Sequence, residues 1–429
     1  MRILLTGANG FIGRHIAGEL LAAGHAVVAS VRPGQQGRLP PGMDYLLADF
    51  AQMLRTDDWL PHLRGVDVVI NCAGILRESG RSTFLAVHEQ APLALYQAAA
   101  QAGVKKIVQI SALGEPADNA FIASKFRGDA ALQSLPIPFV ILRPSVIYSL
   151  RGSYGGTSLL RALAALPSLV FLPGAGQQRI QPLSADDLAR LVLAAATSAA
   201  ADGQVLCVGG PEVLTLRDYL LAWRRWLALG FAVVIPVPLS LVRPAVLLAE
   251  RLAPGPFNRT ILGMLEHGNV VRGNEPDAFA RYGLKAQPLE QALAQQASHV
   301  QDRWHARLYF LRPLTLVLVA AVWLLSAVAG FRAMPAELAP YVQAFGLGLP
   351  LTQALVWGTS ALDAGLGFAL LMRWRPRAVL LLMLFSVLAY TSGFSLFMPG
   401  QWLEPTGGLL KNLLIIPALL FLLATEDAA

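Results

Sequence analysis

The sequence predicts a doubly wound parallel α/β sheet with a small substrate lobe, followed by a bundle of four transmembrane helices. Short apolar runs alternate with helix-like segments in the N-terminal part, and long runs almost without charge collect after about residue 308. Hydrophobic residues make up 55% of the 429 residues, and the mean hydropathy of +0.52 is too apolar for a wholly soluble enzyme. A chain of this length should form two or three folding units.

Strand-like runs in the first 150 residues are continuously apolar, as expected for strands buried on both faces of a parallel sheet. Helix-like segments between them favour βαβ units. We therefore predict one nucleotide-binding domain over residues 1–150 and a smaller substrate lobe over residues 151–300. The expected strands are residues 2–5, 25–31, 45–47, 66–71, 106–111 and 139–142, with helices at 11–23, 84–102 and 121–134 and further strands at 205–208 and 232–235.

A second apolar run, Leu227–Leu248, is interrupted by Pro236, Pro238, Arg243 and Pro244. Prolines break a long helix, so a strand, a turn and a core helix are predicted here. A membrane segment is the alternative.

Residues 305–429 are predicted to form the membrane domain, because four stretches reach or approach spanning length. Two arginine groups, one before the first span and one after the second, are assigned to the cytosol by the positive-inside rule. This places the N-terminal domain and the C-terminus on the cytosolic side of the inner (cytoplasmic) membrane. The spans are Leu314–Phe331, Leu349–Met372, Ala378–Phe397 and Leu409–Leu423, and the arginines are Arg303, Arg307 and Arg312, then Arg373, Arg375 and Arg377.

The formal charge of +7 does not predict a nucleic-acid partner, because the arginines are scattered and no long basic run occurs. Cys72 and Cys207 lie in apolar runs and are expected to be buried free thiols. No metal site is expected.

The turn after the first strand reads Thr6-Gly7-Ala8-Asn9-Gly10-Phe11-Ile12-Gly13 and opens a helix. Gly7 permits a tight turn, Gly10 lets the backbone approach a pyrophosphate, and Gly13 lets helix and strand pack closely. The helix N-terminus then stabilises the anion. The sequence therefore predicts a dinucleotide-binding Rossmann domain.

The second strand ends in Ala29-Ser30-Val31-Arg32, without the acidic residue that usually binds the ribose hydroxyls. Arg32, together with Arg38, can instead accept the 2′-phosphate of NADP, so NADP(H) is favoured over NAD(H). A solvated loop arginine is the alternative.

These residues resemble an extended or atypical short-chain dehydrogenase/reductase, similar to the branch that holds the nucleotide-binding accessory subunit of respiratory complex I. Asp49 matches the acid beside the adenine, Asn71-Cys72-Ala73-Gly74 the Asn-x-Ala-Gly stretch, and Arg143-Pro144-Ser145 the stretch beside the nicotinamide. Ser184–Leu188 and Gly209–Glu212 resemble later landmarks. The resemblance covers about residues 1–300. It implies that the cofactor is bound by Gly7, Asn9, Gly10, Phe11, Ile12, Gly13, Arg32, Asp49, Ala73, Gly74, Lys125 and Pro144.

The resemblance also implies catalytic roles for Ser111 and Lys125. At a position between these two residues the sequence departs from the family's pattern. The family's Tyr-x-x-x-Lys relay reads Phe121-Ile122-Ala123-Ser124-Lys125, so the acidic hydroxyl is absent. Losing such an acid removes roughly 10²–10⁴-fold of rate. Lys125 can still bind the nicotinamide ribose.

Another group can in principle supply the proton. His88 stands near the position of the family's active-site asparagine and histidine titrates near neutral pH, although a surface or helix-capping role is the alternative. Tyr148 and Tyr154 are expected to be packing or substrate-lobe residues.

Residues from about 305 onward resemble a DoxX-like four-helix membrane domain, on Arg312-Pro313, the polar second span and the stretch Glu404–Asn412. Asp363 lies inside the second span, where a carboxylate is costly. We hypothesise that it pairs with Lys411 to line a polar pocket. In the alternative Lys411 extends to the interface and Asp363 bonds a hydroxyl such as that of Ser360.

Three functions remain open. The first is a membrane-tethered NAD(P)(H)-dependent oxidoreductase acting on a lipophilic, quinone- or isoprenoid-like substrate. The second is a non-catalytic NADPH-binding scaffold or sensor that assembles with a protein partner. The third is a sugar-nucleotide epimerase or dehydratase, which suffers most from the missing tyrosine.

Overall fold

The computed structural model describes residues 1–429 except 40, 153, 253–261, 265, 267, 405–407 and 427–429. It divides into two compact units, residues 1–306 and residues 307–429. The predicted nucleotide-binding domain and substrate lobe thus lie together in the first unit, and the division near residue 150 stays a prediction.

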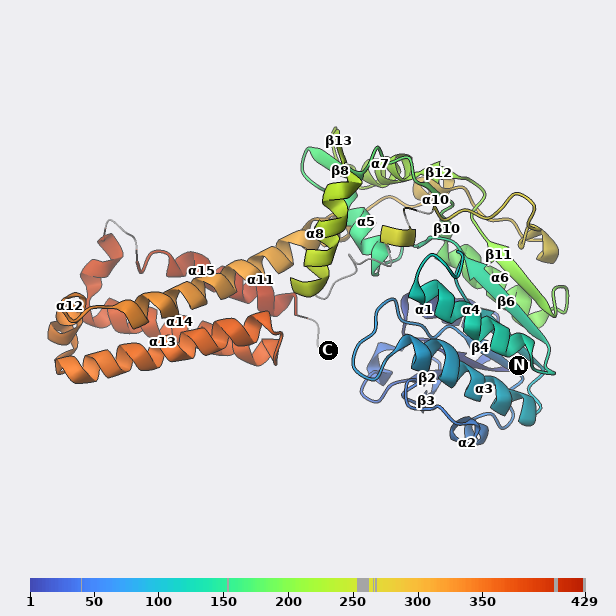
Figure 1. Cartoon of the computed structure of the whole chain (residues 1–429), viewed down its shortest axis with the longest axis horizontal. Coiled ribbons are helices and arrows are strands. Elements are labelled where there is room, and N and C mark those ends of the chain that lie inside the picture. Colours follow the sequence, from blue (N-terminus) through green and yellow to red (C-terminus); the bar gives the residue numbers. More distant parts are fainter. Residues whose placement is uncertain are drawn as a thin grey trace. The chain divides into compact units, whose positions relative to one another are not determined.

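A parallel sheet of seven strands forms the centre of the first unit (Figure 1). Its order, β11-β6-β5-β4-β1-β2-β3, places β1 and β4 side by side, with Thr6 opposite Asn71. The carboxyl ends of these two strands therefore meet at one edge of the sheet, where doubly wound sheets bind ligands. The strands are β1 Arg2–Thr6, β2 Ala26–Val31, β3 Asp44–Leu47, β4 Val68–Asn71, β5 Lys106–Ile110, β6 Phe139–Pro144 and β11 Gln204–Val208.

The last strand of this sheet comes from the part of the chain in which the substrate lobe is predicted. The run Val205–Val208 was expected in the substrate lobe, but β11 pairs with β6 along its whole length, from Gln204 opposite Val140 to Val208 opposite Pro144. The chain thus returns to the sheet after residue 200. The boundary between sheet and lobe is not a single point in the sequence.

Helices cover both faces of the sheet and bury two apolar cores. One core contains Ile16 and Leu20 of α1 together with Leu188 and Val192 of α6. The other contains Leu95 of α3 and Leu132 of α4. The helices are α1 Phe11–Ala22, α2 Thr56–Trp59, α3 Ala91–Gln101, α4 Ala120–Gln133 and α6 Ala185–Thr197.

The substrate lobe is built from two-stranded pairs and short helices around Trp223, Tyr219 and Tyr148. Its strand pairs are β7 Ile147–Tyr148 with β10 Leu183–Ser184, β9 Arg179–Ile180 with β12 Leu214–Thr215, and β8 Leu169–Pro173 with β13 Val233–Val237. Its helices are α5 Gly156–Ala164, α7 Leu216–Trp226, α8 Leu239–Leu252 and α10 Leu289–Gln295.

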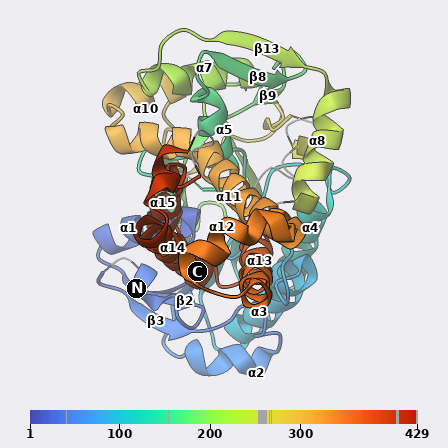
Figure 2. The same cartoon turned by 90° about the vertical axis from the view of Figure 1, so that its left-hand side faces the viewer.

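The second unit is helical, with α11 beginning in the first unit (Figure 2). Three helices, α11, α13 and α14, are long and apolar enough to cross a membrane. The fourth predicted span is the shorter apolar helix α15, and α12 was not expected. Residues 405–407 of the Glu404–Asn412 stretch lie outside the described residues. The helices are α11 Val300–Arg332, α12 Pro335–Phe345, α13 Leu349–Leu371, α14 Pro376–Phe397 and α15 Asn412–Ala424.

A buried ion cluster joins the ends of these helices. Glu426, just after α15, is 6% exposed and forms ion pairs with Arg312 of α11 and with Arg373, whose Nη2 lies 2.6 Å from Glu426 Oε1. Arg377 at the start of α14 donates to the Glu426 carbonyl oxygen at 3.0 Å. This cluster, called the Glu426 cluster below, fixes one end of the bundle.

Candidate functional site

The glycine turn is packed so closely that only glycine fits at two of its positions. A Cβ on Gly13 would lie 2.1 Å from the carbonyl oxygen of Gly7, and a Cβ on Gly7 would lie 2.8 Å from that of Cys72. Gly7 has φ +66°, which side chains disfavour. Helix α1 begins at Phe11 without a side-chain cap on Gly10, so its first N–H groups remain open to an anion. Asn9, Phe11 and Ile12 are half-buried around this opening.

A buried polar network fixes the segment opposite the turn. Thr6 Oγ1 donates to Asn71 Oδ1 at 2.5 Å and accepts the N–H groups of Cys72 and Ala73 at 3.2 and 3.3 Å. Asn71 Nδ2 donates to Tyr96 Oη at 3.0 Å and to Gln109 Oε1 at 2.8 Å. The Asn71–Gly74 stretch is thereby tied to β1 and β5. It packs directly against the glycine turn.

The end of β2 presents Arg32 as an exposed side chain, with no hydrogen bond or ion pair in the described part of the chain. No acidic residue follows the strand. Asp49 is half-buried beyond β3 and is held in place by the Ala51 N–H at 3.3 Å and by Gln52. The Arg38 side chain lies outside the described residues.

Lys125 lies under the Asn71–Gly74 stretch. Its Nζ donates to the carbonyl oxygens of Ala73 at 3.2 Å and Ile110 at 3.3 Å, and a Cβ on Gly74 would approach Nζ to 2.9 Å. Burial lowers the pKa of Lys125, with Cys72 and Asp129 acting in the opposite direction. Two of the three ammonium donors are used, so one remains for a ligand beside Gly74.

Phe121 lies in an aromatic cluster. Its ring makes edge contacts with Phe84 and with His88, at centroid distances of 6.2 and 5.5 Å, and Phe84 stacks on His88 at 5.4 Å. Ala112, Ile122, Phe126 and Met264 complete an apolar patch. Phe121 lies one helical turn before Lys125, on the same face of α4. The side chain at the tyrosine position is therefore surrounded by apolar groups and His88.

His88 is buried and neutral, contrary to both roles weighed for it. The Ile75 N–H donates to its Nε2 at 3.0 Å, so Nδ1 carries the proton and bonds Ser124 Oγ at 2.8 Å. Ser124 in turn donates to the Phe121 carbonyl oxygen at 2.8 Å. Burial lowers the pKa of His88 to about 2, with a smaller contribution from Lys125. His88 therefore cannot replace tyrosine as an acid near neutral pH.

A π-helical turn over Leu85–Gln90 sets this position of His88. Pro92 has no N–H for the His88 carbonyl four residues before it, which disfavours regular α-helical bonding here. A Cβ on Gly128 of α4 would lie 2.2 Å from that carbonyl, so only glycine permits the close packing. Pro92 was the signal in the sequence that could have revealed the turn.

Ser111 does not face an open site. Its hydroxyl donates to Asp129 Oδ2 at 2.8 Å, and the same oxygen accepts Arg143 Nε at 2.9 Å. Burial raises the pKa of Asp129, and Arg143 and Ser111 oppose this. The group was missed in the sequence, although Asp129 follows Lys125 by four residues on the same helix face. Pro144, next to Arg143, is buried at the end of β6 and accepts the Leu113 N–H at 3.0 Å.

Both thiols are free, as expected, but they are half-buried rather than fully buried. Burial raises the pKa of Cys72 to about 12 and also raises that of Cys207. Tyr148 packs on Trp223 at a centroid distance of 5.9 Å and Tyr154 is exposed. Neither contacts the Phe121 patch. Within the described residues, no three metal-binding side chains lie together.

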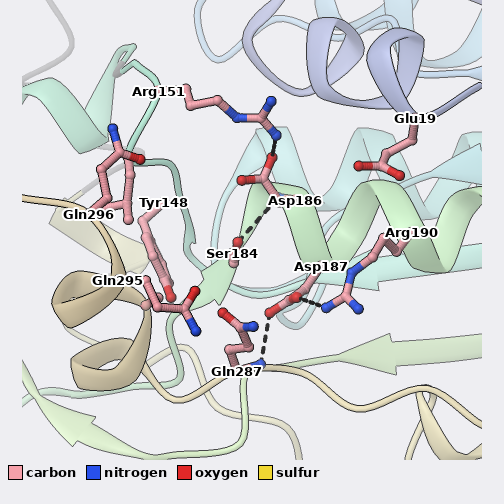
Figure 3. Close-up of a pocket in the computed structure, with 12 residues that line it drawn as sticks. Glu19, Tyr148, Arg151, Ser184, Asp186, Asp187, Arg190, Gln287, Gln295 and Gln296 are labelled. Atoms are coloured by element: carbon pink, nitrogen blue, oxygen red, sulfur yellow. Dashed lines mark hydrogen bonds and ion pairs between the residues drawn. The ribbon is translucent and has the colours of Figure 1, made fainter. Parts of the chain in front are cut away.

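A separate polar cavity of about 390 Å³ lies beside α1, α6 and α10 (Figure 3). Ser184 caps α6, whose Asp186 bonds His15 of α1 at 2.6 Å and pairs with Arg151. Asp187 pairs with Arg190. Both of these carboxylates are thus paired with arginines. Within the described residues Glu19, which also lines the cavity, forms no ion pair.

In the second unit, the expected pair of Asp363 and Lys411 is not formed. Asp363 is 8% exposed and accepts a hydrogen bond from Ser326 Oγ of α11 at 3.2 Å, while Lys411 is exposed and forms no ion pair within the described residues. The alternative, in which Asp363 bonds a hydroxyl, agrees better with the structure, although the hydroxyl is that of Ser326 rather than Ser360. A short side chain in α11 reaches Asp363 more directly than a lysine at the start of α15.

Comparison with known proteins identifies two regions. Residues 3–209 match the NAD dependent epimerase/dehydratase family, and residues 320–420 match the DoxX-like family. The predicted combination of a short-chain dehydrogenase-like domain with a DoxX-like membrane domain is thus confirmed, and the chain is a multi-pass membrane protein.

Among curated relatives, the (4-alkanoyl-5-oxo-2,5-dihydrofuran-3-yl)methyl phosphate reductase of Streptomyces griseus is 27% identical over 219 residues, which cover 50% of this chain and 70% of the relative. The divinyl chlorophyllide a 8-vinyl-reductase of Oryza sativa is 29% identical, covering 49% of this chain and 54% of the relative. The ceramide reductase of Caulobacter vibrioides is 30% identical, covering 34% and 46%. The chain thus spans about half of the latter two.

Solved structures support the fold. A nucleoside-diphosphate-sugar epimerase from Staphylococcus aureus aligns with a TM-score of 0.54 at 19% identity, covering 68% of this chain and 99% of its own. MoeE5 in complex with UDP-glucose and NAD aligns with a TM-score of 0.52 at 19% identity, covering 69% and 97%. At this identity the likeness is one of fold alone.

Proposed function

We propose that this chain, in which an NAD-dependent epimerase/dehydratase-like domain precedes a DoxX-like membrane domain, is a membrane-tethered NAD(P)H-dependent reductase of a lipophilic substrate. The substrate class is a quinone or another isoprenoid-tailed molecule. The observation that carries the proposal is the aromatic patch of Phe84, Phe121 and Phe126, which replaces the polar proton relay directly beside Lys125.

The residues present fit a nicotinamide dinucleotide, because added Cβ atoms would close the turn at Gly7 and Gly13. The open N–H groups of α1 would bind the pyrophosphate, and the remaining Lys125 donor would hold a ribose hydroxyl. When bound, the cofactor supplies a hydride. Phe121 and Phe84 would exclude water and contact the apolar substrate. Reduction of a quinone takes up one hydride and one proton, and water can supply that proton to a quinone oxygen.

The curated relatives support the reductase class, since all three are named as reductases and one is named for ceramide, a lipid. They do not name this chain's substrate. We infer a lipophilic one because the chain carries both the aromatic patch and a membrane domain.

We further propose that NADP(H) is preferred and that the nucleotide-binding domain is cytosolic. Arg32 takes the place of the ribose-binding acid, and the arginines of the Glu426 cluster follow the positive-inside rule. An inner-membrane location brings the domain to the cytosolic pool of nicotinamide cofactors.

Calorimetric titration of the detergent-purified full chain tests cofactor choice. We expect NADPH to bind at least about tenfold more tightly than NADH, with the difference lost in Arg32→Ser and kept in Arg64→Ser, because a phosphate–arginine contact contributes about 1.5–3 kcal/mol. Equal binding of both cofactors to the natural chain would contradict the NADP preference. Binding of neither would contradict the proposed reductase.

Turnover tests the substrate class. In nanodiscs, we expect NADPH oxidation with long-tailed quinones and none with UDP-glucose, because an epimerase or dehydratase needs the acid that Phe121 lacks. Tight NADPH binding without turnover of any lipophilic acceptor would favour the second candidate, an NADPH-binding scaffold that assembles with a protein partner. Neutral His88 and the bound Ser111 favour that candidate.

A further inference from the structure

The apolar run Leu227–Leu248 is not explained by the nucleotide site. The structure resolves it into β13 and α8, as a strand and a helix rather than a membrane span. Proline at position 238 separates the two elements.

One face of α8 is fixed to the rest of the unit. Val242 and Val246, one turn apart, are buried against Leu262. Arg243 forms a two-pronged ion pair with Glu266, with Nε–Oε1 and Nη2–Oε2 distances of 3.1 and 3.2 Å. Helix α8 is therefore held on the segment around residues 262–266 rather than hanging free.

The opposite side of α8 exposes apolar residues. Leu241 is 62% exposed, and Pro244 and Ala245, which share its face, are also exposed. Just upstream, Phe231 is 89% exposed and Val233 is 52% exposed. Exposed apolar residues that gather on one helix face are typical of a surface that another protein or a membrane covers.

One short stretch of chain contributes both to the contact with α8 and to the aromatic patch. Leu262 packs on Val242 and Val246, and Met264, two residues later, packs in the patch with Phe121 and Ala112. Residues 262–264 therefore connect, along the chain, the contact with α8 and the patch beside Lys125. An isoprenoid tail that followed this stretch from α8 would reach the patch.

We propose that α8 docks into the surface of the lipid bilayer and that lipophilic substrate enters the Phe121 patch along this helix. The entry route rests on the proposed function, whereas the docking does not. The bilayer is the occupant because the same chain crosses it: α11 begins at Val300 and is itself a spanning helix. A surface tethered this way meets lipid before any freely diffusing partner.

Depth measurements on the full chain in nanodiscs test the docking without any need for turnover. A nitroxide at Leu241→Cys is compared with one at Tyr45→Cys, which lies on edge strand β3 and is 55% exposed. The natural thiols are poorly reactive background, because burial raises the pKa of both. We expect the label at 241 to collide more with oxygen, which concentrates in lipid, and the label at 45 to collide more with a water-soluble nickel chelate.

Equal access of the nickel chelate to both labels would overturn the docking. A label at 241 shielded from both oxygen and nickel would overturn it as well, since protein rather than lipid would then cover α8. The two substituted side chains are exposed, so neither variant should fail to fold.

Turnover tests the route. Because Leu241→Glu replaces an apolar contact with lipid by a charge that lipid disfavours, it should lower the rate with a long-tailed quinone by about tenfold or more. The rate with a short-tailed, water-soluble quinone should not change. Equal loss with both quinones would overturn the route. No oxidation of NADPH by the natural chain with either would contradict the proposed function, while the labels would still decide the docking.

Discussion

The two sides of the candidate nucleotide site differ in whether the groups expected there are present and free. On the side of the Gly7–Gly13 turn, backbone atoms approach within distances that only glycine permits, and α1 offers open N–H groups. On the side of α4, the tyrosine position is Phe121, the nearby histidine is neutral and the expected serine bonds Asp129. The backbone geometry typical of a dinucleotide turn is therefore kept. On the other side the tyrosine hydroxyl is absent and Ser111 and His88 are already bonded, while Lys125 keeps one donor for a ligand.

This difference indicates which residues of the site can be substituted without disturbing the turn. A pyrophosphate is recognised by backbone groups, so the turn allows almost no substitution. Proton transfer depends on single side chains, which can be replaced without disturbing the turn. The contrast can be tested one side at a time.

The largest effect is expected on the turn. Gly13→Ala forces a Cβ against the Gly7 carbonyl, so the turn must move to relieve the contact. If the moved turn loses about 3 kcal/mol of its contacts with the pyrophosphate, NADPH binds roughly 150-fold more weakly. Gly18→Ala is the matched control, because a Cβ there meets nothing within 4 Å. Calorimetric titration checks both. Equal binding by the two variants would show that the turn is not the cofactor site.

Ser111→Ala should act on stability rather than on binding. Removing a buried hydrogen bond to a carboxylate costs about 2 kcal/mol, so the thermal midpoint should fall while NADPH affinity stays the same. A fall in turnover at unchanged stability would instead give Ser111 a catalytic role. Thermal unfolding and titration of the same preparation separate the two results.

The neutral His88 predicts acid sensitivity. The pKa of His88 is about 2 in the folded chain and about 6.5 when unfolded, so below pH 6.5 only the unfolded form takes up the proton. Stability should fall by about 1.4 kcal/mol from this group between pH 7.5 and 5.5. His88→Gln should lose this part of the dependence. An unchanged pH profile in the variant would mean that His88 titrates normally.

The smallest effect is expected from Phe121→Tyr. A new hydroxyl would lie in an apolar patch, and Ser111 would remain bound to Asp129, so carbonyl reduction should change by less than about threefold, or about 0.7 kcal/mol. Steady-state rates with a small ketone and a long-tailed quinone check this. A rise of about 10²–10⁴-fold would reveal a dehydrogenase silenced only by the missing tyrosine.

Local signals in the sequence predicted the sheet well. Continuous apolar runs located the first six strands, and the glycine spacing located the turn, because both depend on residues close together in the chain. The place of β11 could not be predicted, since its pairing joins Gln204 to Val140. Helix α12 was missed because it is short and lies between two spans.

The groups on the α4 side of the site were predicted less well, because their hydrogen-bond partners lie far away along the chain. The state of His88 depends on Ser124, 36 residues away, and that of Ser111 on Asp129, 18 residues away. Motif spacing identified Phe121 and Lys125 but not which hydroxyl would already be bonded. Asp363 shows the same limit, since Ser326 lies 37 residues before it.

The Glu426 cluster has an electrical consequence. Its three arginines and one glutamate carry a net charge of +2, held at one end of the bundle by buried contacts. Moving a charge across a membrane against the potential costs about 2.3 kcal/mol per 100 mV. An inside-negative potential would therefore favour the proposed orientation, with this end of the bundle on the inner side, through each of those two charges. De-energising the membrane would remove that part of the orientation energy and leave the ion pairs intact.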